Sequence, residues 1–253
     1  MTDKTEFSNK QLVRLIWPLV IEQFLSLAVG LADSIMVAQA GDAAVSGVSL
    51  VDSVVVLMIY IFSAVAAGGA AVCGQYIGRG GHREARSAGQ HLYGLLTVFS
   101  AFLTLLLYVF RGPIVGGLFG KIEPDVMAAT DTYYTIVMAS VPAIALYSAG
   151  TALFRAMGMT EMTLRISLFM NVINVGGNAL LIFGFGFGVE GVAVPTLVSR
   201  WAAAVLVTAL LFRKKYMLNL SELRSFAFNR RVLSNIVRIG IPDRKSTRLN
   251  SSH

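Results

Sequence analysis

The sequence predicts an all-α, polytopic membrane protein in which six helices cross the bilayer as one bundle. Of its 253 residues, 55% are hydrophobic and only 14% are charged, whereas an ordinary soluble domain has about 25% charged residues. The mean hydropathy is +0.68. Its apolar residues also fall into six stretches long enough to cross a bilayer core, which takes about 20 residues each.

These stretches predict helices over residues 11–40, 46–78, 87–110, 126–154, 162–185 and 192–212. Together they form a transmembrane region, residues 11–212, which follows a polar N-terminal segment, residues 1–10. That segment is too polar, and the first apolar stretch too long, for a cleavable signal peptide. Residues 213–242 form a basic linker. Residues 243–253 are polar, basic and unlike the rest, so we interpret them as a non-native tail.

Basic residues divide unequally between the two sets of loops, and this division predicts the orientation. One set has only Arg111 and Lys121, and the set that includes the N-terminus has Lys4, Lys10, Arg14, Arg79, Arg83, Arg86, Arg155, Arg165, Arg213, Lys214, Lys215, Arg224, Arg230 and Arg231. We therefore expect a cytoplasmic N-terminus and a multi-pass protein of the inner (plasma) membrane. The net charge of +7 then reflects topology, and no nucleic-acid partner is expected. Because Cys73 is the only cysteine, no internal disulfide can form.

The first predicted helix carries an aspartate, Asp33, within its apolar stretch. A carboxylate at the centre of a spanning helix costs about 2.5–3.5 kcal/mol on insertion scales, so it is by default a functional candidate. Steps of three and four residues place Glu22, Ser26 and Asp33 on one stripe, with Gln23 beside it. This polar seam predicts a cavity lining. The alternative is that Asp33 only caps the outer end of the helix.

A second polar seam lies on the fifth predicted helix. Its members are spaced four, three and four residues apart, which is one helical face: Ser167, Asn171, Asn174 and Asn178. A single asparagine in a membrane helix often serves only as an interhelical hydrogen bond, worth about 0.6 kcal/mol. Three on one face, beside Gly176 and Gly177, favour a second cavity lining.

Two prolines and one arginine complete the candidates. Pro18 and Pro195 each remove a backbone donor and are expected to bend their helices. The backbone carbonyls that Pro195 frees could act as ligands beside Thr196. Arg200 lies inside the sixth predicted helix, where it either snorkels to the interface or pairs with a buried acid. Glu22 and Asp33 are both possible partners, and the sequence does not choose between them.

The carboxylate, amide and hydroxyl oxygens of Asp33, Asn174, Asn178 and Thr196 would make an all-oxygen set. Such ligands suit a hard cation such as Na⁺, whereas a desolvated carboxylate favours its protonated form, so the site could bind Na⁺ or H⁺. No His/Cys cluster for another metal is present, and no cofactor is expected. The glycines of residues 78–81 lack the Gly-Lys-Ser/Thr ending of a phosphate loop. No nucleophile–base spacing indicates an enzyme.

A series of motifs, in order along residues 10–242, resembles the amino-terminal half of a multidrug and toxic compound extrusion (MATE) transporter. The motifs are Trp17-Pro18; Leu31-Ala32-Asp33-Ser34-Ile35-Met36-Val37; Gly68-Gly69-Ala70-Ala71 with Gln75-Tyr76-Ile77-Gly78; Phe154-Arg155-Ala156-Met157-Gly158; Asn174 with Ile182-Phe183-Gly184; and Gly191-Val192-Ala193-Val194-Pro195-Thr196-Leu197-Val198-Ser199-Arg200. The resemblance implies one lobe of a twelve-helix, two-lobe transporter that exports amphipathic, often cationic compounds in exchange for H⁺ or Na⁺.

The resemblance also maps the cation site of the amino-terminal lobe onto Asp33, Asn174, Asn178 and Thr196. Many family members have an aspartate where this chain has Asn178. With Asp33 as the only acid, the site would reach a charge of −1 at most, and Na⁺ affinity rises with ligand charge. We therefore expect proton coupling through Asp33, with the asparagines orienting the carboxylate and Thr196 donating to it. The implied partners are the bilayer, small amphipathic substrates and a carboxy-terminal lobe that this chain lacks.

The linker repeats the start of the chain. Arg238-Ile239-Gly240-Ile241-Pro242 has the Arg-to-Pro spacing of Arg14-Leu15-Ile16-Trp17-Pro18, which predicts a seventh helix from near Ile236, the first of a second repeat. Two other functions stay open. One is a lipid-linked oligosaccharide flippase of the same superfamily, with cavity cations for an anionic headgroup. The other is a non-transporting membrane scaffold whose polar seams only lock helices together.

Overall fold

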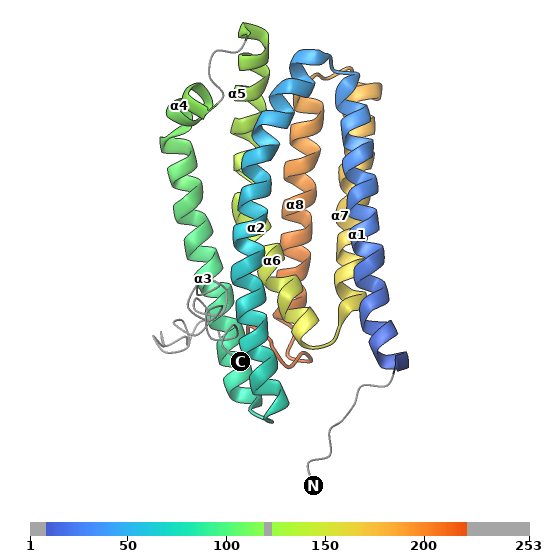
Figure 1. Ribbon diagram of the computed structural model, residues 1–253, viewed down its shortest axis with the longest axis vertical. Helices are drawn as coiled ribbons and strands as arrows, with labels where there is room; N and C mark the ends of the chain where they lie inside the picture. Colours follow the sequence, from blue (N-terminus) through green and yellow to red (C-terminus); the bar gives the residue numbers. More distant parts are fainter. Residues whose placement is uncertain (1–8, 119–122, 222–253) are drawn as a thin grey trace, which may run out of the picture.

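The computed structural model describes residues 9–118 and 123–221, and this part of the chain is a bundle of long helices with short connections (Figure 1). The elements are α1 (Asn9–Ala38), α2 (Asp42–Gly78), α3 (His82–Val109), α4 (Arg111–Pro113), η1 (Ile114–Leu118), α5 (Pro124–Met138), α6 (Val141–Ala156), α7 (Thr160–Ala179), η2 (Leu180–Gly184) and α8 (Glu190–Leu211). In Figure 1, α1 and α7 lie together at one side of the bundle, and α3 lies at the opposite side.

Five spans are long and apolar enough to cross a membrane, and α5 and α6 together make a sixth, bent by 46°. The six-helix prediction is therefore confirmed, but the expectation of one unbroken helix over residues 126–154 was wrong. The break lies at Ala139 and Ser140, just before Pro142. Because Pro142 has no backbone N–H, it cannot donate to the carbonyl of Met138 four residues earlier, and the ladder of hydrogen bonds is interrupted here.

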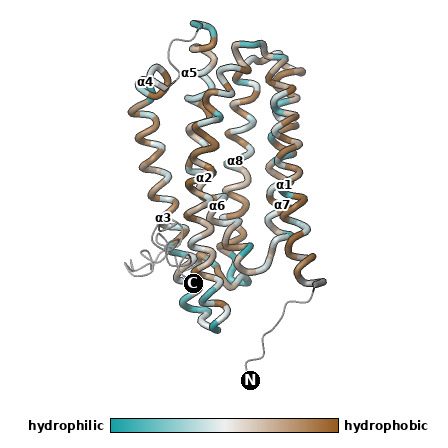
Figure 2. Tube along the Cα trace, in the orientation of Figure 1, coloured by the Kyte–Doolittle hydropathy of each residue, from teal (hydrophilic) through white to brown (hydrophobic). Residues whose placement is uncertain are grey.

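The surface of the bundle has the polarity of a membrane protein. In Figure 2 the apolar residues fill the central length of the helices, and most of the polar residues lie toward the ends. Large apolar side chains such as Phe24, Leu31, Val98 and Val205 are exposed. In water such a surface would aggregate, whereas in a bilayer it meets the acyl chains.

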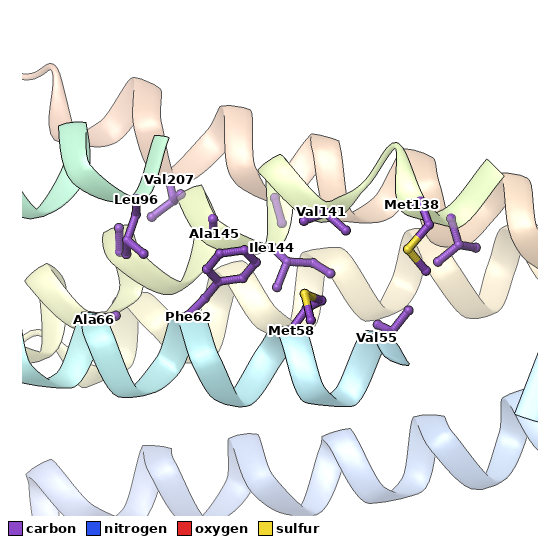
Figure 3. Packing of buried hydrophobic residues seen from close by; sticks show 14 of the residues in the cluster. Val55, Met58, Phe62, Ala66, Leu96, Met138, Val141, Ile144, Ala145 and Val207 are labelled. Atoms are coloured by element: carbon purple, nitrogen blue, oxygen red, sulfur yellow. The ribbon is translucent and has the colours of Figure 1, made fainter. Parts of the chain in front are cut away.

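Helix α2 is the centre of the packing and contacts α3, α5 and α6. Val55, Met58, Phe62 and Ala66 recur every three or four residues along its buried face, and Figure 3 shows them against side chains of α6. Lipid offers apolar groups no gain from leaving water, so close packing has to hold these helices together. Gly69 permits the close packing of α2 against α3, because a Cβ at this position would lie 2.5 Å from the side chain of Leu92 on α3.

The chain that leaves α8 folds back onto the end of the bundle. The backbone N–H of Leu220 donates to the carbonyl of Leu211 at 2.9 Å, and the ring of Tyr216 packs edge-on against Phe154 at a centroid distance of 5.3 Å. Residues 213–221 are thus docked under the helices. The predicted seventh helix from near Ile236 and the tail, residues 243–253, lie outside the described residues.

Candidate functional site

Helix α1 turns two carboxylates, Glu22 and Asp33, toward α7. Eleven residues separate them, which is about three turns and roughly 16 Å along the axis. Glu22 is buried and Asp33 half-buried, but Ser26 and Gln23 are exposed. The predicted seam is therefore not one buried stripe. Because α1 packs mainly on α7 and to a lesser extent on α2, a rotation of about 40° from Glu22 is enough to bring Ser26 to the surface.

The carboxylate of Asp33 is held by amides from α7. Asn178 donates its amide hydrogen to Asp33 Oδ1 at 2.8 Å. Asn174 satisfies its neighbours when its nitrogen faces Asp33, because it then donates to both carboxylate oxygens at 3.1 Å. In this orientation the Asn174 oxygen accepts a hydrogen bond from the Thr196 hydroxyl, also at 3.1 Å. The expectation that Thr196 donates to Asp33 directly is thus corrected, since Thr196 acts through Asn174.

The hydrogen bond between Asn174 and Thr196 depends on a close approach of α7 and α8. A Cβ at Gly177 would lie 2.7 Å from Cβ of Pro195, so only glycine allows the two helices this separation. The approach brings Thr196, the residue after Pro195, within reach of Asn174. Both Pro195 and Pro18 are buried within helices that continue through them. The bend expected at each proline stays a prediction.

Two buried polar atoms of α7 have no hydrogen-bond partner among the described residues: Asn171 Nδ2 and Asn178 Oδ1. Their side chains are 8% and 0% exposed. Such atoms are uncommon in folded proteins and call for an explanation, which can be an ion or water. The Asn178 oxygen lies on the same amide whose nitrogen holds Asp33.

A second carboxylate, Asp52 on α2, belongs to the same cluster. The hydroxyl of Tyr133 on α5 donates to Asp52 Oδ1 at 3.2 Å, and the charges of Asp52 and Asp33 lie close enough to interact. The premise that Asp33 is the only acid of the site was therefore wrong. The sequence did hold a signal, because Asp52 interrupts an apolar stretch as Asp33 does. It lies directly before an uncharged run that extends from Ser53 to Gly78.

Arg200 on α8 supplies the cation of the cluster. Its guanidinium donates to the hydroxyl of Ser140, at the break between α5 and α6, at 2.9 Å. Its charge interacts with both Asp33 and Asp52. Of the two partners that the sequence left open, the structure thus brings Asp33 near Arg200 and leaves Glu22 elsewhere.

The cluster spans different depths of the predicted membrane. Asp33 lies five residues before the end of α1, which is about 7 Å from that end. Asp52 and Arg200 each lie ten residues from the start of their helices, or about 15 Å, which is half the thickness of a hydrocarbon core. Charged side chains at that depth are costly and typical of ion and substrate pathways.

Glu22 forms a separate site near the middle of α1. Arg155 at the end of α6 donates to Glu22 Oε1 at 2.9 Å, and the hydroxyl of Thr163 on α7 lies 3.2 Å from Glu22 Oε2. Glu22 therefore joins α1 to α6 by an ion pair and to α7 by a hydrogen bond. Sequence reasoning had counted Arg155 only as a loop residue that sets orientation.

The ligand chemistry of the described residues limits which metals could bind. Residues 9–118 and 123–221 contain no group of three or more His, Cys, Asp or Glu side chains able to hold a metal ion. A cation at the Asp33 site would instead be held by one carboxylate and neutral oxygens, such as that of Asn178. This donor set fits a proton or an alkali-metal ion.

Comparisons with known proteins agree with this architecture. A family model described as MatE matches residues 18–180. An uncharacterized transporter of Bacillus subtilis, YisQ, is 28% identical over 237 residues, which is 91% of this chain and 51% of YisQ. A probable multidrug resistance protein NorM of Thermotoga maritima is 25% identical over 211 residues, which is 82% of this chain and 45% of that protein.

Solved structures give the same picture of the fold. The outward-facing conformation of a multidrug resistance MATE family transporter of the MOP superfamily aligns with 91% of this chain and 51% of its own, at a TM-score of 0.82 and 22% identity. A MOP superfamily transporter from Pyrococcus furiosus, described by the reverse polarity of its binding pocket, aligns at a TM-score of 0.79 and 24% identity, over 51% of that chain. The present chain thus spans about half the length of the relatives it matches.

Proposed function

Because the chain belongs to the MatE family, whose model matches 163 of its 253 residues (18–180), we propose that it forms the first lobe of a drug-efflux transporter. A second lobe of similar size would complete it, since the relatives are about twice as long. The substrates we propose are small amphipathic compounds, mostly cationic. The names of the NorM relatives support export of drugs. The membrane would be the inner (plasma) membrane, with a cytoplasmic N-terminus.

We further propose that the transporter is an antiporter and that protons entering the cell drive it through Asp33. The observation that carries this proposal is the pair of neutral amides on the Asp33 carboxylate, at 2.8 and 3.1 Å. These donors hold the carboxylate in place without neutralising it, so it still gains from binding a cation. Na⁺ needs several good oxygen ligands and favours added negative charge, whereas a proton needs one carboxylate. A substrate and a proton that prefer opposite states then drive exchange by their differential affinities.

The flippase alternative has one observation in its favour, the cation Arg200 within the membrane-spanning part of α8. Two carboxylates interact with that cation, however, so the cluster as a whole is acidic and suits a cationic partner better than an anionic lipid headgroup. The scaffold alternative would require polar groups that serve only to join helices, and these are normally paired. Dye efflux by the full-length protein, in the experiment below, separates a transporter from such a scaffold.

The test is efflux of a cationic dye by the full-length protein in proteoliposomes. A pH gradient without Na⁺ is expected to drive accumulation, and a Na⁺ gradient at equal pH is expected to add little. Transport that requires a Na⁺ gradient and ignores pH would overturn proton coupling. Absence of dye transport under both gradients, with transport of a lipid-linked oligosaccharide instead, would favour the flippase.

A further inference from the structure

Arg200 and Asp52 lie beside the Asp33 site, near the middle of the predicted membrane, and the proposed function does not yet use them. A buried arginine and a buried aspartate are each expensive there, so their presence together calls for a shared role. Neither is a mere surface residue, since both are half-buried and both interact with Asp33. We therefore consider their effect on the electrostatic potential at the Asp33 carboxylate.

Hydrogen bonds from the scaffold fix both groups. The phenol of Tyr133, which is 2% exposed, holds Asp52 at 3.2 Å. The hydroxyl of Ser140, which is 0% exposed, accepts from Arg200 at 2.9 Å. Ser140 lies at the α5–α6 break, so the interruption of that helix places an acceptor where Arg200 can reach it. Arg200 is thereby held by a neutral group, and its charge acts on both carboxylates.

The charges of the cluster can be counted over every helix that contributes to it. Helix α1 brings Asp33, α2 brings Asp52, α5 brings the neutral Tyr133, and α8 brings Arg200. Helix α7 brings only the amides of its asparagines. The two ionisable groups of α6, Tyr147 and Arg155, interact with Glu22 instead. With both aspartates ionised, the sum is −1.

We propose that Arg200 offsets the charge of Asp52, so that the Asp33 site binds one monovalent cation and no more. This inference rests on the proposed coupling role of Asp33. Once Asp33 holds a proton, the cluster as a whole is neutral, and a neutral cluster can change its surroundings within the bilayer at the lowest electrostatic cost. Without Arg200 the cluster would reach −2, which favours a second cation or Na⁺. Without Asp52 it would reach zero.

The experiment measures protonation of Asp33 directly, in the full-length protein. A hydrophobic carbodiimide reacts with protonated carboxyl groups, and mass spectrometry of the Asp33 peptide gives labelling against pH. Arg200→Gln is expected to move the midpoint of labelling upward, and Asp52→Asn downward, each by on the order of one pH unit. The double variant is expected to return to within a few tenths of a unit of the parent. Arg200→Gln is also expected to let Na⁺ protect Asp33 from labelling.

Two controls keep the result interpretable. Arg200→Lys retains the charge and is expected to leave the midpoint near that of the parent, even if Arg200→Gln folds poorly. Arg111→Gln removes a positive charge that pairs with Asp131 outside the cluster and is expected to change nothing at Asp33. Identical midpoints in all variants, or opposite single shifts that do not cancel in the double variant, would overturn the proposal. Labelling does not need transport, so failure of the proposed function is seen separately, as loss of dye efflux in the parent.

Discussion

Glu22 and Asp33 are both carboxylates of α1, both turned toward α7 and about three turns apart, yet their direct partners differ in kind. Glu22 contacts the guanidinium of Arg155 at 2.9 Å. Asp33 contacts two amides, and the nearest cation of its cluster, Arg200, donates to Ser140. One helix thus has an ion-paired acid near its middle and an acid held by amides near the end that leads to α2.

Under the proposed function, the position of the counter-ion separates an acid that joins helices from an acid that couples transport. A carboxylate in contact with its counter-ion has little to gain from another cation. Glu22 is therefore suited to hold α1 against α6 and α7. Asp33 is oriented by neutral donors, and Arg200 interacts with it electrostatically without a direct hydrogen bond among those described. A mobile cation can therefore still stabilise the Asp33 carboxylate. The predictions below change one acid or its surroundings at a time.

The largest effect is expected for Asp33→Asn in the full-length protein. The asparagine keeps the size of the side chain but cannot take up a proton, so proton-driven dye efflux should fall at least about 100-fold while expression and folding are retained. Asp42→Asn, which changes an exposed acid at the start of α2, is the matched control and should transport normally. Efflux by Asp33→Asn at the rate of the parent would show that the coupling acid lies elsewhere.

This comparison also marks the limit of what sequence could predict. Composition and apolar length gave the six spans, because those depend on the bilayer and not on neighbours. The spacing of Asn174 and Asn178 placed them on one face, and the structure brings that face to Asp33. The spacing of residues predicts which of them share a face of one helix, but it does not predict which other helix packs against that face. Hence the sequence could not show that Ser26 is exposed, or that the partner of Glu22 is Arg155.

Asp52 and the break in the fourth span illustrate two further limits. Asp52 joins the site only because α2, α5 and α8 meet at the same depth, which no single helix reveals. The break before Pro142 depends on a proline that the sequence displays openly, but many membrane helices continue through proline, as α1 and α8 do here. Local sequence thus shows where a break is possible. Tertiary packing decides whether it occurs.

The second prediction concerns the helix contact behind the Asp33 amides. Gly177→Ala would place a Cβ 2.7 Å from the rigid ring of Pro195, so α7 and α8 must separate and the Asn174–Thr196 bond must lengthen. We expect a loss of about 1–3 kcal/mol of stability and roughly tenfold slower efflux. Thermal unfolding of the detergent-solubilised protein and proteoliposome efflux measure the two effects.

The neighbouring glycine supplies the control. A Cβ at Gly176 meets no heavy atom within 4 Å, and alanine favours a helix over glycine by up to about 1 kcal/mol. Gly176→Ala is therefore expected to keep full efflux and equal or slightly higher stability. Equal behaviour of the two variants would mean that the close approach of α7 and α8 does not support the site.

The smallest effect is expected at the neutralised acid. In Glu22→Gln the amide can still accept from Thr163 or Arg155, and Arg155, whose side chain is 43% exposed, can turn toward water. The hydroxyl of Thr163 also keeps the carbonyl of Thr160 as an acceptor at 2.8 Å. The loss of stability should therefore be only about 1 kcal/mol, seen as a lower unfolding temperature. The double variant with Arg155→Gln should lose less stability than the sum of the two single variants, because both remove the same ion pair.

The pH dependence of efflux by Glu22→Gln should match that of the parent, since Glu22 gains nothing from a further cation. A shift of that profile in Glu22→Gln would show that the ion pair opens during transport, and that both acids of α1 take part in coupling.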